Sequence, residues 1–75
     1  MAESIINFVL RGDVITLDAL LKATGLAPSG GGAKQTIASG QVQVDGQVEL
    51  RRGAKLRDGQ VVQFGATRVH ITAGT

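Results

Sequence analysis

The sequence carries its strongest chemical signal in one short basic segment. Residues 51–57 read Arg-Arg-Gly-Ala-Lys-Leu-Arg, so four of the seven are basic and none is acidic. Arginine suits phosphate because its planar group offers two parallel N–H donors to paired oxygens. Strand and turn signals flank the segment and favour a fixed position for it. The alternative is a solvated surface loop. We predict that the segment binds an anion through Arg51, Arg52, Lys55 and Arg57.

A second candidate anion site is the run Ser-Gly-Gly-Gly-Ala-Lys at residues 29–34. It lacks the Gly-Lys-Ser/Thr order, following a strand, of the nucleotide-hydrolysing phosphate loop. Three glycines in the first turn of a helix leave N–H groups uncovered at the positive end of the helix dipole, which suits a phosphate oxygen. Close packing between two helices would explain the glycines equally well. The candidate residues are Ser29, Gly30, Gly31, Gly32 and Lys34.

Catalytic and metal-binding chemistry has little support in the sequence. There is no cysteine, and His70 is the single histidine, placed between apolar residues of a strand-like run. The carboxylates are scattered singly through turns and caps, so no pair is spaced as acid and base partners and no cluster has metal-ligand spacing. We expect a protein that is not an enzyme and that uses no cofactor.

Composition predicts one small globular domain over residues 1–75. The chain has 43% hydrophobic residues and a formal net charge of +2. Residues 1–40 hold three basic and three acidic residues, so the positive excess lies in the second half, around residues 51–57. No secretory signal and no apolar run of membrane-spanning length is present. With the absence of cysteine, this predicts a cytoplasmic protein.

The elements that position these residues follow from hydrophobic period and turn signals. Residues 5–10 alternate like a strand, and apolar spacing then predicts two short helices. The first is capped by Thr16 and stopped by Gly25, whereas the second is capped by Ser29 and stopped by Gly40. Strands follow, with an Asp45-Gly46 hairpin turn between the first two. The order predicts an α+β domain. The expected later strands are 42–48, 61–64 and 68–72.

Aromatic content separates the modes of nucleic-acid binding. The chain has two phenylalanines, no tryptophan and no tyrosine. Phe8 and Phe64 lie in apolar strands and are expected in the core. Proteins that bind single strands stack bases on exposed aromatic rings. We therefore expect contacts to phosphates and recognition of shape, which favours a structured RNA.

Residues 16–64 resemble the S-four-type RNA-binding domain, also called the alpha-L motif, and especially its small stand-alone YbcJ-like members. The shared pattern comprises Leu-Asp-x-x-Leu at 17–21, Ser-x-x-x-Ala at 29–33, Ile-x-x-Gly-x-Val-x-Val-x-Gly at 37–46 and Lys-Leu-x-x-Gly-x-x-Val at 55–62. The resemblance implies two short packed helices against a small, mainly antiparallel sheet. It also implies that the helices and the segment after the hairpin form one RNA-facing surface.

The resemblance carries the RNA-binding role onto the start of the second helix (29–32), Lys34 and the four basic residues of 51–57. It implies structured ribosomal or transfer RNA, or the ribosome, as partner. Two positions depart from the family pattern, because Thr16 and Gly30 stand where many members have arginine. Asp45 stands where asparagine is common in the turn.

Other functions fit the sequence less well. A protein-interaction module could use the 51–57 segment to meet an acidic partner, and this remains the main alternative. A ubiquitin-like sulfur carrier needs a C-terminal Gly-Gly, whereas this chain ends Ala-Gly-Thr. A DNA-binding recognition helix should carry base-reading side chains, yet the second helix opens with three glycines. We expect a monomer.

Overall fold

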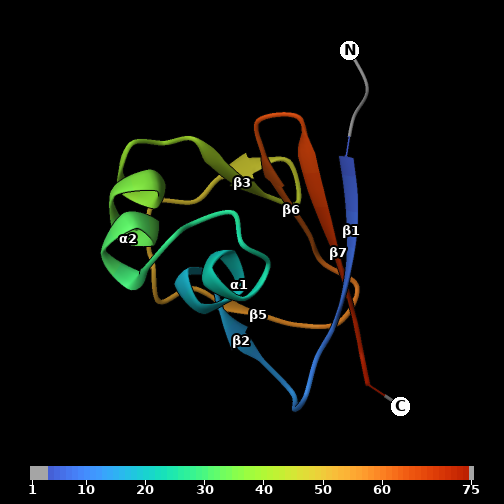
Figure 1. Cartoon of the computed structure of the whole chain (residues 1–75). Helices are drawn as coiled ribbons and strands as arrows, with labels where there is room; N and C mark the ends of the chain where they lie inside the picture. The colour runs from blue at the N-terminus through green and yellow to red at the C-terminus, as the bar shows by residue number, and fades with distance from the viewer. Residues whose placement is uncertain (1–3, 75) are drawn as a thin grey trace.

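The computed structural model describes residues 4–74 of the chain as two layers, with two helices covering one face of a five-stranded sheet (Figure 1). Across the sheet the strands run in the order β1-β7-β6-β3-β4, and a separate two-stranded sheet pairs β2 with β5. The strands are β1 Ser4–Val9, β2 Ile15–Thr16, β3 Val42–Val44, β4 Gln47–Val48, β5 Lys55–Leu56, β6 Val61–Phe64 and β7 Thr67–Thr72, and the helices are α1 Leu17–Ala23 and α2 Gly30–Ala38. The predicted α+β class, with a mainly antiparallel sheet, is confirmed.

The one parallel pairing joins the first and last strands. β1 lies beside β7 with Ser4 opposite Thr67 and Val9 opposite Thr72, and the remaining neighbours are antiparallel. Because side chains alternate along a strand, β1 directs Ile6 and Phe8 toward the helices and leaves Ile5 and Val9 exposed. The strand predicted at 5–10 therefore has the expected inward face.

Helix α1 is short and buries one stripe. Leu17, Leu20 and Leu21 are fully buried at helical spacing. Gly25 follows the helix with a φ of 79°, the left-handed conformation expected of a glycine that ends a helix. The opposite face of α1, with Ala19 and Lys22, is exposed.

Helix α2 begins and ends as predicted. The Ser29 hydroxyl accepts a hydrogen bond of 3.1 Å from the Gly32 N–H, which is the expected N-cap. Ala33 and Ile37 are buried, and Gly40 closes the helix with a φ of 80°. The two helices pack against each other through these buried faces.

The core lies between the helices and the sheet and contains no buried polar or charged residue among those described. Phe8 and Phe64 are half-buried at its border rather than inside it as expected from the sequence. No helix in residues 4–74 is long and apolar enough to cross a membrane. The buried set is Leu10, Leu17, Leu20, Leu21, Ala27, Ala33, Ile37, Val42, Leu56, Val62, Val69 and Ile71.

Candidate nucleic-acid interface

The basic segment, residues 51–57, is anchored by its own apolar residue. Leu56 is buried in the core, and its neighbour Lys55 is exposed. Strand β5 pairs with β2, which sets Lys55 opposite Thr16 and Leu56 opposite Ile15. The positive side chains are therefore displayed from a fixed backbone beside the start of α1.

The same segment supplies the cap of α1. The Leu17 N–H donates to the Ala54 carbonyl at 2.9 Å, and the Asp18 N–H donates to the Arg52 carbonyl at 3.0 Å. Thr16 occupies the predicted N-cap position, but its side chain makes no capping hydrogen bond. The prediction of a Thr16 side-chain cap was therefore wrong. Main-chain carbonyls of the basic segment accept the hydrogen bonds of the first two N–H groups of the helix instead.

Asp18 adds a negative charge at this junction. The Thr16 hydroxyl, the Ala19 N–H and the positive charge of Arg52 hold the pKa of Asp18 below its usual value, and the hydroxyl is the largest cause. The Ala19 N–H donates to Oδ1 at 2.8 Å. The charge of Arg52 therefore acts on the Asp18 carboxylate at the start of α1.

Arg51 is engaged by Glu49. Its Nε donates to Oε2 and its second guanidinium nitrogen donates to Oε1, both at 3.2 Å, while its main-chain N–H donates to Oε2 at 3.1 Å. These contacts lower the pKa of Glu49. The Arg51 side chain is 80% exposed, so this is a solvated pair of the kind that contributes little and can be exchanged. A phosphate at Arg51 must compete with this carboxylate.

Arg57 is placed by a chain of hydrogen bonds that reaches the hairpin turn. Its N–H donates to the Gln60 Oε1 at 2.7 Å, and the Gln60 amide donates to Asp45 at 3.1 Å. Asp45 also accepts from the Val61 N–H at 3.0 Å. Asp45 therefore has a structural role, because its carboxylate accepts two hydrogen bonds at the turn. The sequence showed only that aspartate replaces the more common asparagine, and it did not indicate this role.

The glycines of α2 leave two N–H groups uncovered. Ser29 accepts from Gly32 and from Ala33, whereas Gly30 and Gly31 donate to no described residue. A Cβ built on Gly30 would meet nothing within 4 Å, and one on Gly31 would meet only the Ser29 hydroxyl at 3.9 Å. Close helix packing therefore does not explain these two glycines.

A shallow groove reaches the second predicted anion site at Gly30. It has a volume of about 280 Å³ and lies between the exposed side of α1 and the start of α2. Thr16 and Gly30, the two positions where arginine is missing, both line it. Small residues at these positions leave the groove open. Its lining is Thr16, Asp18, Ala19, Lys22 and Gly30.

Lys22 is a lining residue that was not among the predicted site residues. It lies one turn after Asp18, at i+4, on the side of α1 opposite the buried leucines. That spacing was readable from the sequence. Lys34 is likewise one turn after Gly30 on α2 and is exposed, but it is not among the residues that line the groove.

The four predicted basic residues of 51–57 thus fall into three groups. Arg52 and Lys55 lie at the start of α1, beside Thr16 and Asp18, which line the groove together with Gly30. Arg51 lies with Glu49, and Arg57 with Gln60. Within residues 4–74 no three histidine or acidic side chains cluster as a metal site.

Comparison with known proteins identifies the family to which this chain is similar. The S4 domain family matches residues 8–72, a wider span than the 16–64 recognised in the sequence. The chain is 46% identical over 59 residues to the "Putative RNA-binding protein YbcJ" of Escherichia coli (strain K12), a match that covers 79% of this chain and 84% of the relative. A protein of Shigella flexneri, "Uncharacterized protein YbcJ", matches to the same extent.

A solved structure agrees with these sequence matches. The solution structure of YbcJ from E. coli, described as revealing an AlfaL motif involved in RNA binding, superposes with a TM-score of 0.68 and 43% identity. The superposition covers 89% of this chain and 86% of that one. By sequence and by fold, this chain belongs to the S4 domain family.

Proposed function

We propose that this protein binds structured RNA, without catalysis, through phosphate contacts and shape. The observation that carries the proposal is the groove at the start of α1. There the basic segment caps the helix through main-chain carbonyls, Lys22 lines the groove, and Gly30 at the start of α2 lines its other side. Basic side chains and a helix N-terminus beside one groove suit a phosphate chain.

The relatives support this function. The E. coli relative is named as RNA-binding, and its structure is described by a motif involved in RNA binding. The lack of an exposed aromatic side chain along the groove argues against stacking of a flexible strand there. We propose ribosomal or transfer RNA, free or in the ribosome, as the partner, and the cytoplasm as the place of action.

The residues of the proposed interface form one set. It comprises the predicted residues and one addition, Lys22, which lines the groove. The set is Ser29, Gly30, Gly31, Gly32, Lys34, Arg51, Arg52, Lys55, Arg57 and Lys22.

A fluorescence-anisotropy titration tests the proposal. It compares an RNA hairpin, a single-stranded RNA and duplex DNA at several salt concentrations. With four or five phosphate contacts, counterion release gives a slope of log affinity against log salt of about −3 to −4.5. The variant Arg52→Gln/Lys55→Gln should weaken hairpin binding and flatten the slope by roughly two units. Arg68→Gln, on β7 outside the interface, is the matched control for loss of charge.

The outcomes discriminate between functions. Preference for the hairpin, reduced in the double variant and kept in the control, supports RNA binding at this surface. Equal and negligible binding of all three nucleic acids contradicts it and favours the alternative, in which the basic segment meets an acidic protein.

A further inference from the structure

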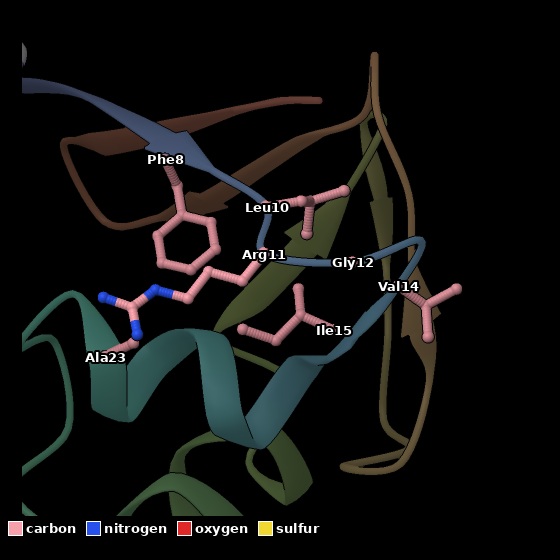
Figure 2. Close-up of a pocket in the computed structure, with 7 residues that line it drawn as sticks. All are labelled: Phe8, Leu10, Arg11, Gly12, Val14, Ile15 and Ala23. Atoms are coloured by element: carbon pink, nitrogen blue, oxygen red, sulfur yellow. The ribbon is translucent and has the colours of Figure 1, made fainter. Parts of the chain in front are cut away.

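A second hollow lies between the end of β1, the start of β2 and the last residue of α1. It has a volume of about 580 Å³ and is largely apolar. Phe8 and Ile15 are half-buried against the core and Leu10 is buried. Packing against the core therefore holds these three lining side chains in place. Figure 2 shows its lining residues, which are Phe8, Leu10, Arg11, Gly12, Val14, Ile15 and Ala23.

Arg11 is the one charged residue in this lining. Figure 2 shows its side chain extending between the Phe8 ring and Ala23. The side chain is exposed, and within residues 4–74 it has no hydrogen-bond or ion-pair partner. An apolar hollow beside an aromatic ring and an unpaired guanidinium fits a ligand with a flat apolar body and an attached anion. A nucleotide has both parts.

The hollow and the groove lie along the same stretch of chain. Ala19 lines the groove and Ala23, one helical turn later, lines the hollow. A phosphate chain held in the groove would therefore reach the hollow within a short distance along α1.

We propose that the hollow binds one unpaired base of the bound RNA. The exposed Arg11 side chain moves aside from the Phe8 ring, the base stacks against the ring in its place, and Arg11 contacts the phosphate of the same nucleotide. This inference rests on the proposed function and adds to it a preference for RNA with an extruded base. Phe8 thus provides the aromatic contact that the groove itself lacks.

The test compares two RNA hairpins that differ only by a single unpaired adenosine in the stem. Stacking of one base gives an expected preference of about tenfold for the bulged hairpin. Phe8→Leu keeps an apolar side chain but removes the ring, and Arg11→Gln removes the charge at an exposed position where folding is not at risk. Both variants should lose most of the preference, which is the ratio of the two affinities measured with the same variant, so that a general effect of the lost charge on both hairpins cancels. Arg68→Gln is the matched control.

Each outcome bears on the proposal. A preference that is lost in Phe8→Leu and Arg11→Gln but kept in Arg68→Gln supports it. Equal binding of the two hairpins, or a preference that survives in Arg11→Gln, overturns the base site and leaves the proposed function standing. Failure of both hairpins to bind overturns the proposed function and the base site together.

Discussion

At the scale of single residues, the four charges of the basic segment are not equivalent. Arg51 is paired with Glu49, and Arg52 lies in the field of Asp18, whereas Lys55 and Arg57 have no acidic partner among the described residues. A count of basic residues in the sequence treats all four alike. The structure predicts that their contributions to anion binding differ.

Removal of the Glu49 charge should strengthen RNA binding. In Glu49→Gln, Arg51 no longer has to leave a carboxylate before it meets a phosphate, so we expect affinity to rise about two- to fivefold at low salt. Anisotropy titrations measure the change. The same substitution made in an Arg51→Gln protein is the control, because a double-mutant cycle isolates the pair. An equal gain in both backgrounds would show that general repulsion, not the pair, is responsible.

Asp45 predicts a dependence of stability on pH. The Val61 N–H and then the Gln60 amide hold its pKa below the usual value in the folded protein. A carboxylate with a lowered pKa stabilises the fold above its unfolded pKa of about 4, and this stabilisation is lost as the pH falls through the folded pKa. Asp45→Asn tolerates the φ of 51° but cannot accept from both donors.

We therefore expect Asp45→Asn to be slightly less stable than the parent at pH 7, and the difference to shrink as the pH falls below the unfolded pKa of about 4. Urea unfolding over a series of pH values measures it. A difference in stability that stays constant with pH would mean that the conformation of the turn, and not the charge of Asp45, causes the loss of stability in Asp45→Asn.

At the scale of elements, the start of α2 combines two kinds of glycine. Gly31 faces open space, whereas a Cβ on Gly32 would lie 3.1 Å from the Pro28 ring. Alanine favours a helix over glycine by up to about 1 kcal/mol. Gly31→Ala should therefore raise the free energy of unfolding, and Gly32→Ala should gain less or lose, because the proline must shift. Thermal unfolding compares the two, and an equal gain at both positions would contradict the packing argument.

The sequence predicted the two helices and the longer strands, but it did not predict the short pairing of β2 with β5. The helices showed in the spacing of Leu17, Leu20 and Leu21 and in the Ser29 cap, since period and capping are local properties. The pairing of β2 with β5 involves two residues a strand, too few to show a period, so Lys55 could not be placed opposite Thr16. The capping of α1 by carbonyls of 52 and 54 is equally non-local.

The candidate site was predictable to a similar extent. Residue types pointed to the basic segment and the glycines, and the resemblance joined them on one surface. The groove that lies beside both, with Lys22 in its wall, required the packing of α1 against α2. The hollow beside Phe8 was missed because an apolar strand residue gives no sign that one side of its ring stays uncovered.

At the scale of the whole molecule, the two helices cover one face of the sheet (Figure 1). Residues of α1 line both candidate binding hollows. The net charge is only +2, so binding depends on where charge lies rather than on its total. A positive charge added inside the groove should therefore raise the affinity for RNA as much as one further phosphate contact does.

Gly30→Arg tests this. The position has open space for a side chain, and the family resemblance places arginine there in many relatives. We expect tighter hairpin binding and a salt slope steeper by roughly one unit. Gly30→Gln supplies a side chain of similar reach without charge, and the same gain in that variant would exclude an electrostatic cause.

The parallel pairing of β1 with β7 also sets the order in which the protein folds. The pairing brings together residues separated by about sixty positions, so it closes a long loop, whereas the helices and the antiparallel hairpins form from near neighbours. We expect β1 to join after the main barrier. Ile6→Val should then speed unfolding and leave the folding rate nearly unchanged in stopped-flow measurements. A slower folding rate would place β1 in the nucleus. If β1 joins last, the strand that carries Phe8 completes the hollow at the end of α1 only in the final step of folding.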